Sequence, residues 1–237
     1  MSKKAASLKP IFIEAVQELH DELELTRENV ANQAAEHIHS GEVIMTMDHS
    51  RTVQSFLQAA AKNRRTFNVI VAETAPNFSG RTLAAELAGS TPPVETLIIS
   101  DASSFALMSR CTKLIIGCHA IFADGSVLAK SGALGLALAA RAHLVPVVIV
   151  SGMYKFSPEY VRAGEEWSIC DQQSPEEVLI QLKQDQFDES KVMGEVEVLN
   201  PYYDRIPGEL VSLFITNLGG HPSSLVYRLL KDLYGTS

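Results

Sequence analysis

The residues best suited to chemistry lie in one stretch, Lys113 to Leu138 (KLIIGCHAIFADGSVLAKSGALGLAL). Its opening apolar run is short and ends at a glycine, which is typical of a buried strand. We expect a turn at Asp124 and Gly125 and a helix that begins near Ser131 and Gly132. In an open α/β sheet, ligands lie at the carboxyl ends of strands, where helix N-termini offer N–H groups to anions. The stretch therefore predicts a pocket for an anionic, phosphate-bearing ligand.

Groups able to act as acid, base or nucleophile occur at the predicted strand ends, but they do not form a complete catalytic site. They are Asp48, His49, Glu73, Asp101, His119 and Asp124. Asp48-His49-Ser50 has the residue types of a catalytic triad, yet neighbours in sequence point in different directions. We therefore expect Asp48 or Ser50 to cap the helix that follows.

Thiol, metal and nucleotide chemistry are also unsupported by the sequence. Cys118 and His119 are adjacent, and adjacent side chains rarely form an activated thiol pair, so a packing role is favoured. No pair of ligand residues here has the spacing of a structural zinc site, so we expect no metal. The motifs G-x-G-x-x-G and G-x-x-x-x-G-K-[ST] do not occur, so we expect no cofactor.

Most of the chain alternates short apolar runs with amphipathic stretches. The expected strand and helix pairs are 43–47 with 52–61, 68–72 with 82–88, 96–100 with 103–108, and 113–117 with 133–142, before a strand at 147–150. Such alternation is typical of a parallel sheet with helices on both faces. The predicted fold class is α/β, a Rossmann-like parallel sheet preceded by a short helical segment.

The two ends of the chain depart from this alternation. Helices after Pro10 and after Thr26, a candidate N-cap, form a helical lead-in at 1–40, ahead of one α/β domain at 41–237. Residues 157–190 are acidic and rich in glutamine, which indicates a loop with one short helix at 175–182. The remaining expected elements are strands at 195–199 and 210–216, a rigid extended segment NPYYDRIP at 200–207, and a last helix at 223–233.

The composition excludes several classes of protein. With 237 residues, 46% of them hydrophobic, the chain can bury a large core. Its formal net charge of −8 argues against nucleic acid as a direct partner, although Lys62, Arg64 and Arg65 form a local basic patch. We expect no segment to span a membrane. The three cysteines form no C-x-x-C pair, so we expect free thiols and a reducing compartment, the cytoplasm.

Seven motifs, taken in order, resemble one protein family. They are VIMTMDHSRTV, IVAETAP, SDASSFALMSR, KLIIGCHAIFADGSV, MYKFSP, NPYYDRIPGELV and LFITNLGGHPSSLVYRLLKDLY. Together they resemble the carboxyl-terminal domain of the alpha, beta and delta regulatory subunits of eukaryotic translation initiation factor 2B, and the beta type most. The resemblance covers about residues 25–235.

The chain also resembles two enzymes of the same fold, methylthioribose-1-phosphate isomerase and ribose-1,5-bisphosphate isomerase. Their catalytic cysteine falls on Asp48 and their catalytic aspartate on His119, so the resemblance implies that both catalytic groups are missing. It implies a vestigial pocket in which Arg81 and Lys130 remain as phosphate contacts. The residues of this vestigial pocket are Asp48, Arg81, His119, Asp124 and Lys130.

The function implied by the resemblance is regulatory. The chain is expected to be a non-catalytic subunit of the guanine-nucleotide exchange factor for initiation factor 2, within a core that senses phosphorylation of the alpha subunit of initiation factor 2. The implied partners are the delta, gamma, alpha and epsilon subunits of factor 2B, and initiation factor 2. An isomerase of sugar phosphates, or a sensor that binds them without turnover, is the alternative.

The resemblance also leads to expectations about assembly. Beta subunits of the family have a longer helical domain, so residues 1–40 are expected to be its remnant. Apolar surfaces near Met153-Tyr154 and Phe214-Leu218 would be hidden by partner subunits. The candidate interface residues are Met153, Tyr154, Asn200, Asp204, Phe214 and Asn217.

Overall fold

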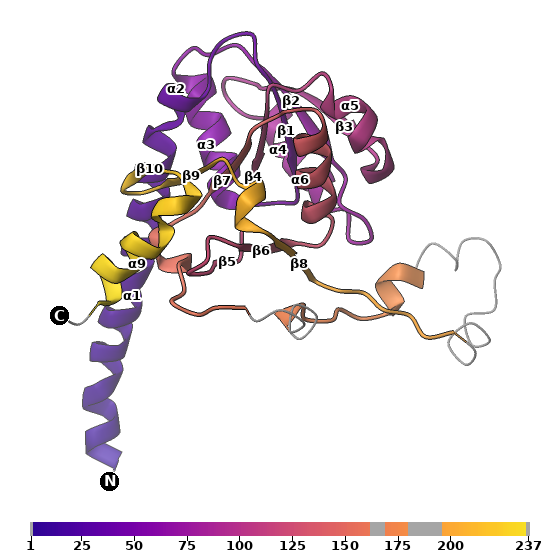
Figure 1. The fold of residues 1–237 in the computed structure, drawn as a ribbon. Coiled ribbons are helices and arrows are strands. Elements are labelled where there is room, and N and C mark those ends of the chain that lie inside the picture. The colour runs from indigo at the N-terminus through magenta and orange to yellow at the C-terminus, as the bar shows by residue number, and fades with distance from the viewer. Residues whose placement is uncertain (1, 162–168, 180–195, 236–237) are drawn as a thin grey trace.

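The computed structural model describes residues 2–161, 169–179 and 196–235, in which helices lie on both faces of a central sheet (Figure 1). The helices are α1 (Ser2–Asn32), α2 (Ala34–His37), α3 (Arg51–Lys62), α4 (Ser79–Ala88), α5 (Ser104–Met108), α6 (Ala133–Ala142) and α9 (Val226–Tyr234). Short 3-10 turns are η1 (Asp101–Ser103), η2 (Met153–Lys155), η4 (Gly208–Leu210) and η5 (Ser223–Leu225). The strands are β1 (Val43–Met47), β2 (Asn68–Ala72), β3 (Glu95–Ile99), β4 (Lys113–Ile116), β5 (Ala120–Ile121), β6 (Val127–Lys130), β7 (Val147–Val150), β8 (Tyr203–Ile206), β9 (Leu213–Thr216) and β10 (Gly219–His221).

The central sheet has the predicted Rossmann-like character. Its strand order is β10-β9-β7-β4-β1-β2-β3, and the pairs are parallel apart from β10 with β9. The order reverses between β1 and β4, because β2 and β3 lie on one side of β1 while β4, β7 and β9 lie on the other. A smaller antiparallel sheet, β5-β6-β8, lies below the carboxyl ends of the central strands (Figure 1).

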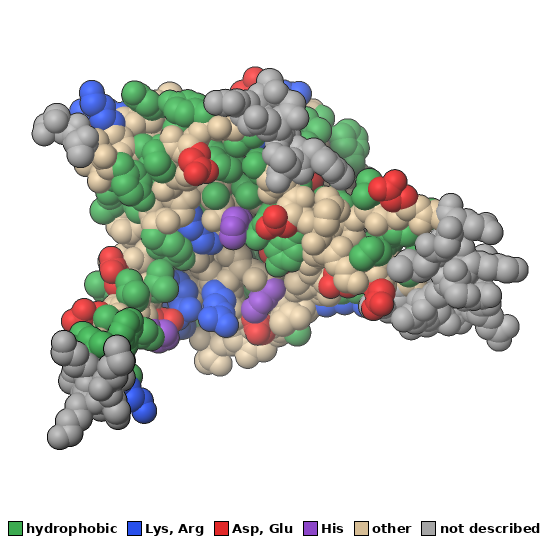
Figure 2. Space-filling model, turned by 90° about the horizontal axis from the view of Figure 1, so that it is seen from below, with side chains coloured by type: hydrophobic (Ala, Val, Ile, Leu, Met, Phe, Trp, Pro, Cys, Tyr) green, Lys and Arg blue, Asp and Glu red, His purple; other side chains and the backbone are tan. Residues whose placement is uncertain are grey.

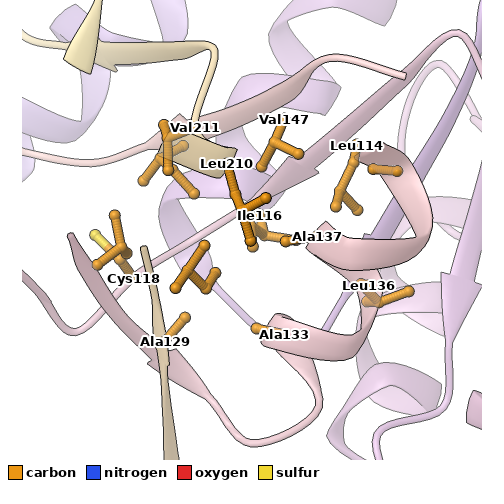
Figure 3. Packing of buried hydrophobic residues seen from close by; sticks show 14 of the residues in the cluster. Leu114, Ile116, Cys118, Ala129, Ala133, Leu136, Ala137, Val147, Leu210 and Val211 are labelled. Atoms are coloured by element: carbon orange, nitrogen blue, oxygen red, sulfur yellow. The ribbon is translucent and has the colours of Figure 1, made fainter. Parts of the chain in front are cut away.

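The core is divided by the sheet into two apolar clusters. Alternate residues of one strand face opposite clusters, as the pleat requires: Ile116 of β4 lies in the cluster with α6 and α9, and Ile115 in the cluster with α3 and α4. Figure 3 shows the first cluster, where Ile116 and Val147 of the sheet face Ala137 of α6. Complete burial of both strand faces explains why these strands read as continuous apolar runs.

The N-terminal helices differ from the prediction of two separate helices. A single helix, α1, runs through both Pro10 and Thr26 and projects from the body of the molecule (Figure 1). The helical spacing of apolar residues is continuous from Leu23 to Val30 and Ala34, so Thr26 lies within a helix and caps nothing. Val30 and Ala34 are buried against the sheet, so the end of the lead-in contributes to the core of the α/β fold.

The C-terminal part contains the other departures from prediction. The strand expected at 195–199 is wrong for its described part, 196–199, which has no strand beside it. The extended segment instead supplies β8, which pairs with β6. The strand expected at 210–216 begins only at Leu213, as β9, because Leu210 belongs to η4. Gly219 and Gly220 belong to the hairpin strand β10. Residues 176–179 are helical as expected, and the rest of the predicted 175–182 helix lies outside the described residues.

Candidate functional site

A pocket of about 310 Å³ lies where the strand order reverses, beyond the carboxyl ends of β1 and β4. Ligands of doubly wound α/β proteins bind at this point of the sheet. Figure 2 looks at the molecule from this side, and Lys, Arg and His side chains gather near the middle of the view. The pocket is lined by residues 48–52, which run from the end of β1 into the first turn of α3, and by 117–119 after β4. Its other lining residues are Lys130, Tyr154, Lys155, Tyr202 and Tyr203.

Asp48 occupies the place where the related isomerases are expected to carry their cysteine. Its backbone has a φ of 60°, and its Oδ1 accepts a hydrogen bond from Ser79 Oγ at 2.6 Å. Its N–H donates to Thr74 Oγ1 at 2.8 Å. Asp48 therefore joins the end of β1 to the loop before α4.

The other two residues of the apparent triad have separate partners. Ser50 Oγ accepts from the N–H of Val53 at 3.4 Å and so caps α3, as the sequence predicts. His49 Nε2 lies 2.7 Å from Glu86 Oε2. Asp48 and His49 contact different residues of α4, and Ser50 contacts α3, so the three side chains do not bond to one another as a triad requires.

His119 lies in the pocket wall against Tyr203. Its Nδ1 is 3.0 Å from the Tyr203 hydroxyl, and the two rings stack with centroids 4.6 Å apart. Burial, followed by the charges of nearby Tyr202, Asp171 and Asp48, raises the pKa of Tyr203, so its hydroxyl stays protonated at neutral pH. Tyr203 thus holds the imidazole in place, and it is a residue that sequence reasoning assigned only to a rigid segment.

Cys118, next to His119, is buried and packs in the first core cluster (Figure 3). Burial raises the pKa of its thiol, although Lys155 and Ser151 oppose that effect. The thiolate is the nucleophilic form of cysteine, so a raised pKa disfavours a catalytic role. Its carbonyl accepts from Lys155 Nζ at 2.6 Å, which holds this second pocket lysine by the backbone.

Lys130 is largely buried, with its Nζ 3.5 Å from the centre of the Tyr202 ring. Burial lowers the pKa of its ammonium group, while Asp48 and Glu177 act in the opposite direction. A cation placed over an aromatic face is stabilised by the ring. The lysine that the sequence assigns to a phosphate is therefore engaged with an internal partner. Of the cations that line the pocket, Arg51 at the start of α3 is the exposed one.

Two residues of the predicted vestigial pocket lie outside it. Arg81 pairs with Glu73 at 2.6 Å, and its guanidinium lies 4.0 Å from the Phe78 ring centre. Asp124 belongs to the β5–β6 turn, where its Oδ2 accepts from Arg205 Nη2 of β8 at 2.8 Å. Neither is among the residues that line the pocket, which brings together Asp48, His119 and Lys130.

Asp124 gives the small sheet a pH-dependent contribution to stability. Burial by itself raises the pKa of this carboxyl, but hydrogen bonds from Ser126 and the charge of Arg205 outweigh it, so the pKa is lowered. A carboxyl with a lowered pKa stabilises the fold above its unfolded pKa, about 3.9, and loses that contribution as the pH falls through its folded pKa.

Asp124→Asn is therefore expected to lower the free energy of unfolding at pH 7 by about 1 kcal/mol. The difference from the unmodified protein should shrink as the pH falls from about 5 toward 3. Urea unfolding across this range measures it, with Asp232→Asn, an exposed carboxyl on α9, as the matched control. A difference of equal size at all pH values would contradict the role of the charge.

The candidate interface residues are largely engaged within the chain. Met153, Asn200 and Phe214 are buried, and Asn200 Nδ2 donates to Ser174 O at 3.0 Å. Asp204 Oδ2 accepts from the N–H groups of Gly132 and Leu134, at 2.7 and 3.2 Å, and so caps α6. Asn217 Oδ1 accepts from the N–H of Met153 at 2.9 Å. Of the six, Tyr154 alone has a side chain more than half exposed.

Membrane and metal features are missing from the part of the chain that is described. None of its helices combines the length and the apolar character needed to cross a bilayer. Its His, Cys, Asp and Glu side chains do not gather into a group of three suited to a metal ion.

Comparison with known proteins places the chain in a family. A sequence profile described as the Initiation factor 2 subunit family matches residues 1–223. The chain belongs to the Initiation factor 2 subunit family. Within the family, it is 45% identical to translation initiation factor eIF2B subunit beta of Dictyostelium discoideum, over 96% of this chain and 56% of that protein. The chain thus spans little more than half the length of this relative.

The chain is also similar to an enzyme and to solved structures. Ribose 1,5-bisphosphate isomerase of Pyrococcus furiosus is 32% identical over 97% of this chain and 68% of that protein. A chain of the tetrameric eIF2B-beta2-delta2 complex of C. thermophilum has a TM-score of 0.69 and 27% identity, covering 96% of this chain and 66% of that chain. The eIF-2B delta subunit of A. fulgidus, 20% identical, shares the fold with a TM-score of 0.80, over 95% of this chain and 66% of that one.

Proposed function

We propose that this chain is a beta-type regulatory subunit of the guanine-nucleotide exchange factor for initiation factor 2. In this role it has no catalytic centre and works in the cytoplasm through its contacts with the delta, gamma, alpha and epsilon subunits and with initiation factor 2. The level of identity to eIF2B subunit beta supports the assignment. The contacts made by the side chains of the pocket, at the point where the strand order reverses, support the lack of catalysis.

The observation that carries the proposal is that Asp48, His119 and Lys130 of the pocket are each engaged with a partner inside the chain. Asp48 bonds to Ser79, and His119 to Tyr203. Lys130 lies on the Tyr202 ring. An isomerase needs an acid or base within reach of the substrate and a free cation for its phosphate. Here Asp48, His119 and Lys130 stabilise the structure of the pocket, which leaves Arg51 as its exposed cation and, among the described residues that line it, no acid or base free to act on a substrate. The carboxyl end of the sheet therefore serves as a scaffold for assembly.

Association with partner subunits tests the proposal directly. The tagged full chain is co-expressed with the delta and gamma subunits of its own organism, and the three are expected to purify as one complex of defined stoichiometry. A chain that purifies without either subunit would rule out the beta position. Sensing of phosphorylation is then measured as nucleotide exchange on initiation factor 2, phosphorylated or not, with the assembled factor.

The alternative is binding or isomerisation of a sugar phosphate, favoured by Arg51 and the α3 N-terminus at the pocket and by the identity to ribose 1,5-bisphosphate isomerase. Purified chain incubated with ribose 1,5-bisphosphate is expected to show no turnover. The melting temperature with and without this compound separates a sensor from a protein that binds nothing. Turnover at ordinary enzyme rates would contradict the non-catalytic assignment.

A further inference from the structure

The β3 strand is an open edge of the central sheet. It lies at the end of the strand order and pairs only with β2. The carbonyl of Ile99 accepts from the N–H of Glu73 at 2.9 Å, so Ile99 directs its backbone groups toward β2. Because backbone groups alternate along a strand, Thr96 and Ile98 present their N–H and C=O groups outward. A row of such groups is a template for another strand.

This edge is apolar on both faces of the sheet. The register of Leu97 with Ile70 places Leu97 on the face covered by α5 and α6, and the register of Ile98 with Val71 places Ile98 on the face of α4. Leu97 is 52% exposed and Ile98 44% exposed. Edge strands of proteins that stay monomeric are usually blunted by lysine, proline or a bulge. The sequence ETLII contains neither lysine nor proline.

The opposite edge of the same sheet is protected. There β10 is only three residues long, Gly219–His221, and a Cβ added at Gly220 would lie 3.4 Å from the His37 ring. A short strand covered by a helical segment offers little to a partner. Of the two edge strands of the central sheet, β3 is thus the exposed one and β10 the covered one.

The surface beside β3 extends the apolar area. On the face of Leu97, α5 follows β3 and carries Phe105, which is 58% exposed. The Phe105 ring packs on His143 with centroids 4.9 Å apart. Next to His143, Leu144 is 91% exposed. An apolar patch beside an open strand edge is typical of a protein interface.

We propose that β3 pairs antiparallel with the corresponding edge strand of a delta-type subunit, so that the two central sheets become continuous. This inference rests on the proposed function. Outward backbone groups flanked by apolar side chains are satisfied by an apolar strand, whereas a helix would leave them unpaired. A delta subunit has this fold, and a complex of beta and delta subunits exists among the relatives.

The geometry of β3 suits a pseudo-twofold pairing centred on Leu97. Such an axis would place Thr96 opposite the partner's equivalent of Ile98, which uses the outward N–H and C=O groups. The Leu97 side chain would then meet its counterpart across the axis, where cross-strand side chains are close. Glu95, the one charged residue of β3, would face the partner's equivalent of Ile99.

The test compares Leu97→Lys with Leu233→Lys in the full chain, each mixed with the delta-type subunit. Leu233 is a matched control because it is 47% exposed and lies on α9, away from β3 (Figure 1). A lysine buried in the paired interface lacks a counter-charge, so Leu97→Lys is expected to raise Kd at least about tenfold. Leu233→Lys should leave Kd unchanged, and melting temperatures check that both variants fold.

Hydrogen exchange of the unmodified chain gives a second readout that needs no variant. In the complex, the amides of Thr96 and Ile98 should exchange more slowly, because they become hydrogen-bonded. Unchanged exchange of these amides, or wild-type affinity of Leu97→Lys, would overturn the proposed pairing. Absence of any complex for the unmodified chain would overturn the proposed function first. A complex of two copies of this chain would overturn the choice of partner.

Discussion

Replacing Gly80 with alanine is expected to lower the free energy of unfolding by about 3 kcal/mol or more, or to prevent folding. A Cβ at this position would lie 2.0 Å from the carbonyl oxygen of Ala72 and 3.0 Å from the carbonyl carbon of Glu73. Both are backbone atoms at the end of β2, so no side-chain rotation relieves the clash. The first turn of α4 would have to move away from the sheet.

Gly135→Ala is the matched control, because Gly135 lies within α6 and nothing is within 4 Å of its added Cβ. Glycine in a helix interior costs up to about 1 kcal/mol relative to alanine, so this variant should be as stable as the unmodified chain or more so. Urea unfolding of both variants, with soluble yield as a first indication, measures the difference. Equal stability of the two alanine variants would show that α4 is not held against β2 as described.

Phe214→Ala is expected to lower the free energy of unfolding by about 3–5 kcal/mol, because a large cavity would open in the core. Phe214 lies in β9, fully buried, with its ring centre 6.1 Å from that of Phe156. The sequence suggested an interface role for this residue. That role would instead predict that Phe214→Ala leaves the chain stable but weakens its binding to a partner subunit. Chemical unfolding of the free chain decides between the two roles.

Leu218→Ala serves as the control for Phe214→Ala. Leu218 is an exposed side chain near the same part of the chain, so its truncation should change stability by less than about 0.5 kcal/mol. A Phe214→Ala chain as stable as Leu218→Ala would mean that the ring does not support the core.

The most accurate predictions from sequence concern the buried parallel strands. The runs at 43–47, 68–72 and 147–150 match β1, β2 and β7 residue for residue. Each is a short apolar run that turn residues bound on both sides, which is a local signal. Capping by Ser50 is also local, since it depends on residues within one helical turn.

Errors arose where a residue's role depends on a distant partner. The segment 203–206 forms a strand because β6 lies beside it, and its sequence between two prolines indicated only an extended chain. Arg81 has the charge for a phosphate contact, but it contacts Glu73 and Phe78 and is not among the residues that line the pocket. Tyr203, which holds His119, is separated from it by 84 positions.

The sequence by itself determined the α/β class, the family and the positions of the buried parallel strands, because periodicity, turns and caps act over a few residues. Tertiary structure alone decided which side chains share a site. The strand order places β1 beside β4, so Asp48 and His119 line one pocket, and it leaves β3 at an edge where Leu97 stays exposed. Strand neighbours are selected by the packing of the whole core, to which residues far apart in the chain contribute together.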